Sequence, residues 1–192
     1  MSRFQSIESM HLAIGLAIHE YQFVEEAILR VLHALYEDSK ALEVAFFHLQ
    51  GDSRLRLMDK IITQRLPAPD RRRWVQLRDA IDTCTRDRNV FVHHAITYDG
   101  LRPVLRPSVF DPSRYGDSDE RASSEEPYYV ADIHQSVRSF KALTAELRHF
   151  AQSIHWNEEV RQGYGLCHKQ LPEPPVWSLP VTRRSKSHQK RK

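Results

Sequence analysis

The sequence predicts an all-α protein, an up-and-down bundle of four or five helices, with a long irregular insert and a short β-hairpin before the last helix. Three observations favour this fold class. Apolar residues recur at helical spacing over long segments, only 6 Gly occur in 192 residues, and the best periodic segments contain none of the 10 Pro. With 41% hydrophobic and 28% charged residues, the composition is that of a globular domain.

The first helix is predicted over residues 7–35. Two apolar series repeat every seven residues and interleave at 3.5-residue spacing, which is typical of a helix that packs along its whole length. The series consist of Ile7, Ile14, Tyr21, Ile28 and Leu35, and of Met10, Ala17, Val24 and Val31. Such a helix is roughly 45 Å long and needs partners to be stable.

Three further helices are predicted before residue 96. Asp38 or Ser39 caps a second helix that runs through Leu49, with Leu42, Ala45, Phe46 and Leu49 on one face. Gly51-Asp52-Ser53 ends the second helix and starts a third, which uses Leu55, Met58, Ile61, Ile62 and Leu66. Pro67-Ala68-Pro69 ends it, and Asp70 caps a fourth helix from about Arg71 to Ala95.

The helical pattern disappears over the insert, residues 97–130. Val104-Leu105 and Tyr128-Tyr129-Val130 are expected to form the strands of the hairpin, and a last helix follows from Ala131 or Asp132 to Trp156. We expect residues 1–156 to form the bundle, and residues 157–192 to be a Pro-rich and then basic, disordered tail. The tail holds eight Lys/Arg and three acids, so it carries +5 and the body −2 of the net +3.

Several classes of protein are disfavoured. No apolar run approaches the ~20 residues that cross a bilayer, and Met1 to Ser6 lacks a signal-peptide core. We therefore expect a cytoplasmic protein in which Cys84 and Cys167 are reduced thiols. No histidine or cysteine spacing is typical of a metal site, so we expect neither metal nor cofactor.

Arg88 is the anomaly of the fourth helix, because it occupies an apolar seam position between Cys84 and Phe91. A guanidinium there loses hydration and must be paired or face a cleft. Asn89 and His93 are four residues apart and share a helix face. An imidazole can act as general acid or base, and a guanidinium can stabilise charge on a phosphoryl oxygen. With an amide to orient them, these groups can cleave RNA without a metal, the ribose 2′-OH being the nucleophile.

The segment Arg88-Asn89-Val90-Phe91-Val92-His93 resembles the Arg-x4-His motif of HEPN (higher eukaryotes and prokaryotes nucleotide-binding) domains. The long first helix, the two helices before the motif helix, the insert after it and the closing helix also match, over roughly residues 6–156. The long insert and the basic tail depart from the simplest members of the family.

The resemblance implies a helical homodimer in which the two motif helices face each other across a cleft. It also implies a metal-independent endoribonuclease that acts on RNA as a toxin or in defence against phage, with an antitoxin protein as a further partner. His93 would be the acid/base, Arg88 the phosphate stabiliser and Asn89 the orienting residue. Many HEPN-like domains are inactive and serve instead in dimerisation or binding.

Other residues are weaker candidates for substrate binding. Arg86 is an alternative cation, His94 adjoins the motif, and Arg71, Arg72 and Arg73 lie in a first helical turn, where the macrodipole disfavours cations. Two alternatives to the nuclease stay open. In a silent helical dimerisation or binding module, Arg88 would form an ion pair with an acid such as Glu25 or Glu26. In a nucleic-acid-binding accessory protein, the basic tail would act alone.

Overall fold

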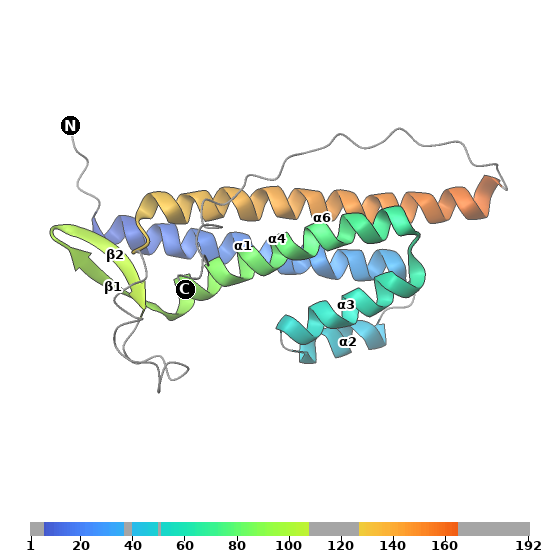
Figure 1. Cartoon of the computed structure of the whole chain (residues 1–192), viewed down its shortest axis with the longest axis horizontal. Helices are drawn as coiled ribbons and strands as arrows, with labels where there is room; N and C mark the ends of the chain where they lie inside the picture. Colours follow the sequence, from blue (N-terminus) through green and yellow to red (C-terminus); the bar gives the residue numbers. More distant parts are fainter. Residues whose placement is uncertain (1–5, 37–39, 50, 108–126, 165–192) are drawn as a thin grey trace, which may run out of the picture.

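A computed structural model describes residues 6–36, 40–49, 51–107 and 127–164. Within them the chain forms five helices and a two-stranded hairpin, which confirms the predicted all-α bundle (Figure 1). The helices are α1 (Ile7–Leu35), α2 (Lys40–His48), α3 (Gly51–Arg65), α4 (Ala68–His93) and α6 (Val130–Tyr164), and the strands are β1 (His94–Asp99) and β2 (Arg102–Pro107).

Helix α1 has the bounds that its apolar repeat predicts. Ser6 caps it by accepting a hydrogen bond from the backbone N–H of Ser9. Both heptad series are buried from Met10 onward except at Ile14, which is half-buried, while Ile7 at the start is 41% exposed. The seam therefore organises the core everywhere except in the first turn.

Helix α6 runs beside α1 in the same direction, and α4 runs antiparallel to both (Figure 1). Tyr21 of α1 meets Phe140 of α6 edge to face, with ring centroids 5.5 Å apart. On α4, Trp74 stacks on Phe150 at 6.2 Å, whereas Phe91 lies 6.4 Å from Phe140. These aromatic contacts fix the relative register of the three long helices.

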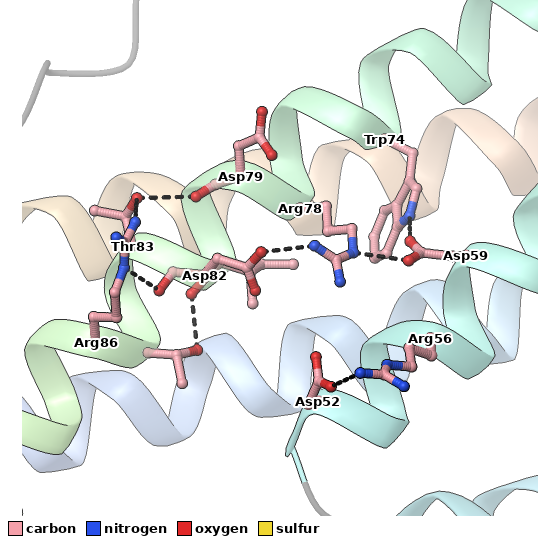
Figure 2. A network of polar contacts seen from close by, with 11 residues as sticks. Asp52, Arg56, Asp59, Trp74, Arg78, Asp79, Asp82, Thr83 and Arg86 are labelled. Carbon is pink, nitrogen blue, oxygen red and sulfur yellow. Dashed lines mark hydrogen bonds and ion pairs between the residues drawn. The ribbon is translucent and has the colours of Figure 1, made fainter. Parts of the chain in front are cut away.

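The short helices α2 and α3 cover only part of the α1–α4 surface (Figure 1). Arg54 of α3 joins them by donating to the carbonyl oxygens of Phe46 and Leu49 at 2.9 and 2.8 Å. Arg78 of α4 lies between Asp59 of α3 and Asp82 of its own helix, with N–O distances of 2.8 and 2.6 Å (Figure 2). The covered part of α4 is thus held by polar contacts as well as by packing.

Two details of the predicted helices are wrong. Helix α4 begins at Ala68, with Pro67 as its N-cap, so Asp70 lies inside the first turn and does not cap it. Proline fits there because the first helical N–H groups have no intrahelical acceptor. On α2, Phe46 is buried as predicted but Ala45 is exposed, while Asp38 and Ser39 lie outside the described residues.

The hairpin is built differently from the prediction. Val104-Leu105 is part of a strand, but its partner is β1, which continues directly from α4. Gly100 makes the turn with a φ of +60°, a conformation that favours glycine. Tyr128 forms only an isolated bridge to Leu105, and Val130 already begins α6. The hairpin is therefore formed from residues 94–107 alone, and it begins directly after α4.

Helix α6 also continues to Tyr164, past the predicted end at Trp156. The first residues assigned to the tail are therefore helical. Residues 165–192, which hold most of its basic side chains and Cys167, lie outside the described residues. The predicted disorder of those residues stays a prediction.

Candidate functional site

The candidate site lies at the C-terminal end of α4, on the stretch that α2 and α3 leave uncovered (Figure 1). Cys84 and Phe91 are buried before and after it, while Arg88 between them is half-buried. The helix ends at His93 because the next residue, His94, has the extended backbone that starts β1. The motif thus occupies the last two turns of a helix anchored by its core face.

Arg88 makes two contacts. Its Nη1 donates to Oδ1 of Asn89 at 3.1 Å, and its guanidinium carbon lies 5.9 Å from the ring centroid of Tyr21 on α1. Within the described parts of the chain, no carboxylate forms an ion pair with it. The two acids considered as partners are paired elsewhere, Glu25 with Arg54 and Glu26 with Arg30. No carboxylate of the described residues therefore neutralises the charge of Arg88.

The ring of Tyr21 on α1 lies against the guanidinium of Arg88. Its ring is buried, and its hydroxyl lies 2.8 Å from that of Thr85, which also donates to the carbonyl oxygen of Ile81. Burial raises the pKa of Tyr21, and the hydrogen bond to Thr85 opposes this shift without cancelling it. Tyr21 is therefore a neutral platform for a cation, not an acid at physiological pH.

Asn89 and His93 are both exposed on the same side of α4, together with Val92. The amide of Asn89 contacts Arg88 directly, whereas the imidazole of His93 lies one turn further along the helix. The structure thus joins Arg88 to Asn89 and leaves His93 accessible to solvent. A single copy offers one imidazole in this position.

The neighbouring weaker candidates have different surroundings. Arg86 is exposed, and it donates to the carbonyl oxygen of Asp82 and to the hydroxyl of Thr83, both at 3.3 Å. His94 is half-buried, with its ring 6.5 Å from that of Tyr128. Arg86 therefore lies on the helix face of Asn89 and His93 and not on that of Arg88, whereas the ring of His94 contacts Tyr128.

The three arginines at the start of α4 do not join this site. Twenty-two residues separate Arg71 from His93, which is roughly 33 Å along a helix. Arg73 pairs with Glu146 at 3.3 Å and contacts Nδ1 of His149 at 3.0 Å, so α6 neutralises it. Arg71 and Arg72 remain exposed. Any binding by this cluster would be at the opposite end of the bundle.

Other chemistries find little support in the described residues. No group of three or more His, Cys, Asp or Glu there could hold a metal ion. Burial raises the pKa of Cys84 to about 12, with a smaller contribution from the charge of Asp87, so this thiol is a poor nucleophile. None of the helices described is long and apolar enough to cross a membrane.

Comparison with known proteins gives no assignment. No family model, no curated protein and no solved structure matches the chain. The arrangement of the described side chains is therefore the basis of any functional proposal.

The sequence interpretation missed Tyr21 and Thr85 as parts of the site. Tyr21 was counted only as a core residue, although it is the one hydroxyl-bearing member of the apolar repeat in α1. A buried tyrosine normally needs a hydrogen-bond partner. That requirement could have directed attention to a hydroxyl on a neighbouring helix.

Proposed function

We propose that this protein is a HEPN-like, metal-independent endoribonuclease whose site forms where the C-terminal ends of two α4 helices meet. One observation carries the proposal. Arg88 occupies a core seam position without an ion-pair partner in the described residues, five residues before the exposed imidazole of His93. Retaining a cation there lowers packing quality, and binding an anion such as a phosphodiester would offset that cost.

The proposed reaction uses the substrate's own hydroxyl. One His93 imidazole removes the proton from a ribose 2′-OH, whose oxygen attacks the phosphorus and forms a 2′,3′-cyclic phosphate. The bond from phosphorus to the 5′-oxygen breaks, and the departing oxygen receives a proton from a second imidazole. Arg88 stabilises the charge on the phosphoryl oxygens, and Asn89 orients Arg88 through the 3.1 Å hydrogen bond.

The need for a second imidazole supports a homodimer. Within the described residues His93 is exposed, and Val92 on the same face is 42% exposed. Tyr98 and Leu101 of the hairpin are exposed by 60% and 80%. Covering this apolar surface with a second copy would bring two His93 side chains to one cleft.

The same exposed side chains suit the alternative, a silent dimerisation or binding module. That alternative predicts an intramolecular ion pair for Arg88, which is absent from the described residues. A role as a toxin or in phage defence, with an antitoxin partner, is supported by the resemblance alone. The nuclease is therefore the reading that the site favours.

A cleavage assay with single-stranded RNA in excess EDTA tests the proposal. We expect the wild-type protein to release fragments that end in 2′,3′-cyclic phosphate. Both Arg88→Ala and His93→Ala should slow cleavage by about 10²–10⁴-fold, since each removes a group that acts in the transition state.

The matched controls are His48 at the end of α2 and Arg65 at the end of α3, which are both exposed. His48→Ala and Arg65→Ala make the same chemical changes away from the motif and should leave the rate unchanged. Cleavage that persists undiminished in both motif variants would reject the assignment. Loss of cleavage in the control variants as well would show a general effect of lost surface charge.

A further inference from the structure

A cavity of about 540 Å³ lies between α1, the start of α3 and α4. This volume is within the range of small-molecule sites, about 300–1,000 Å³. Its walls are mainly apolar and include Ile28, Phe46, Leu55 and Ile81. A flat, partly apolar ligand would bury its faces against these side chains.

Three carboxylates line the cavity, and each uses only one oxygen in an ion pair. Glu25 binds Arg54 through Oε1, Asp52 binds Arg56 through Oδ2, and Asp82 binds Arg78 through Oδ2, with distances of 3.4, 2.7 and 2.6 Å. In Figure 2, Asp82 on α4 and Asp52 at the start of α3 lie on opposite sides of the space between these helices. In the described residues the second oxygen of each carboxylate makes no hydrogen bond.

The remaining polar groups of the cavity are largely satisfied. The hydroxyls of Tyr21 and Thr85 lie 2.8 Å apart and bond to each other. Arg54 is engaged by three carbonyl oxygens, those of Phe46, Phe47 and Leu49, in addition to Glu25. Apart from the exposed guanidinium of Arg86, the unused hydrogen-bonding capacity of the described lining side chains consists of carboxylate oxygens, which accept and do not donate. The matching ligand therefore presents N–H donors at the edge of a flat body.

The cavity adjoins the candidate active site. Tyr21 lines the cavity and also carries the guanidinium of Arg88 over its ring at 5.9 Å. Arg86, which lines the cavity too, is exposed two residues before Arg88 on the same helix. Residues two apart on a helix point to different sides, so a nucleotide with its base in the cavity would place its phosphate near Arg86, and only Tyr21 is shared with Arg88.

We propose that this cavity is a base pocket, a site for a nucleobase that carries an exocyclic amino group. Guanine, adenine and cytosine direct amino N–H donors at acceptors, whereas uracil has a carbonyl oxygen in the corresponding position and would face a carboxylate oxygen with it. That the base belongs to an RNA substrate rests on the proposed nuclease function. The same chemistry would also recognise a free nucleoside or nucleotide that acts as an effector.

Two matched glycines allow the pocket to be blocked with a control. Gly51 lines the pocket and Gly15 is exposed on α1, and a Cβ added at either would meet nothing within 4 Å. Gly51→Phe should fill the pocket, while Gly15→Phe adds the same side chain outside it. Asp82→Asn is a second pocket variant, which keeps the shape of the side chain and removes its charge.

Binding is measured by calorimetry with nucleosides at millimolar concentration, on the full chain. Cytidine should bind about tenfold or more tightly than uridine, and adenosine more tightly than inosine, as expected for one hydrogen bond to a charged group. Gly51→Phe should abolish binding, Asp82→Asn should weaken binding of cytidine and adenosine selectively, and Gly15→Phe should leave both unchanged.

The cleavage assay then identifies the source of the base. A rise in KM for RNA in Gly51→Phe, with an unchanged rate in Gly15→Phe, shows that the pocket holds a substrate base. Lost nucleoside binding with unchanged cleavage shows a free nucleoside as the ligand. If the wild-type protein binds nucleosides but cuts no RNA, the nuclease proposal fails and the pocket stands. No preference for amino-bearing nucleosides, or binding that survives Gly51→Phe, overturns the pocket whatever the protein does to RNA.

Discussion

Helix α4 carries arginines toward both of its ends, and their surroundings differ. Toward the N-terminal end, Arg73 is paired with Glu146, and Arg78 lies between two aspartates. Toward the C-terminal end, Arg88 meets only an amide and an aromatic ring within the described residues. In the first half of the helix Arg73 and Arg78 pair with carboxylates and hold neighbouring helices, whereas in the second, open half Arg88 pairs with no carboxylate of the described residues. Residue type alone therefore does not separate structural from functional arginines, whereas their partners do.

The largest expected effect on the free energy of unfolding is that of a substitution in the first half of α4, which holds the bundle together. Trp74 is 2% exposed, stacks on Phe150 and donates to Asp59 at 2.8 Å. Trp74→Ala should lower the free energy of unfolding by about 3–5 kcal/mol in urea denaturation. Val92→Ala in the open half should change it by less than about 0.5 kcal/mol. Similar decreases in the free energy of unfolding for the two variants would contradict the division of α4 into a structural half and an open half.

The reactivity of the buried Cys84 thiol measures whether solvent reaches the core between the first and second halves of α4. Its pKa is raised from an ordinary value near 9 to about 12, so the folded state keeps the thiol protonated. In a Cys167→Ser background, alkylation at pH 8 should be about a thousandfold slower in the folded than in the urea-unfolded protein. The stability that comes from the neutral thiol should be complete below about pH 9, and should be lost as the pH rises toward 12. Rapid labelling of the folded protein would show that this part of the core opens.

Arg88→Leu separates stability from activity in the open half. Leucine continues the apolar seam between Cys84 and Phe91, so the variant should be at least as stable as the wild type. Its RNA cleavage should fall by about 10²–10³-fold, because the charge that stabilises the phosphoryl oxygens is gone. A variant that is both inactive and clearly destabilised would show instead that Arg88 is a structural residue.

A small effect on stability is expected for the ion pair that joins α4 to α6. Arg73 and Glu146 are 22% and 23% exposed in their side chains, so solvent screens them only in part. A double-mutant cycle with Arg73→Ala and Glu146→Ala should give a coupling of about 1 kcal/mol in the free energy of unfolding. RNA cleavage should be unaffected by a change at this end. A defect in cleavage would mean that the arginines at the start of α4 contact the substrate.

The long helices could be predicted because each combines strong periodicity with a clear boundary. The repeat from Ile7 to Leu35 defines α1 to the residue, and Pro67 with Pro69 marks the break before α4. The hairpin partner could not be predicted, since strand pairing depends on contacts that propensity does not encode. Local propensity favoured Tyr128 to Val130 as a strand, but residues that follow α4 directly reach Val104 through a turn of only Gly100 and Leu101.

The candidate site was predictable to the extent that it breaks a pattern. Arg88 stands out because it replaces an apolar residue in a seam. The cavity beside it could not be found in this way, because Tyr21, Gly51 and Asp82 are separated widely in sequence and only the fold brings them together. The sequence also could not show that Arg88 has no ion pair with a described residue. Glu25 and Glu26 are possible partners by sequence, and only the structure shows that they pair with Arg54 and Arg30.

The bridge between Leu105 and Tyr128 has a consequence for engineering and for evolution. Paired backbone hydrogen bonds of 2.9 and 3.1 Å join these residues, and the hydroxyl of Tyr129 donates to Asp99 at 2.9 Å. The described segments on either side of residues 108–126 are therefore joined to each other at this bridge. Doubling the length of the connection between them should cost only about 0.6 kcal/mol in closure entropy. A reporter peptide or a new recognition module could be accepted there while the helical frame stays intact.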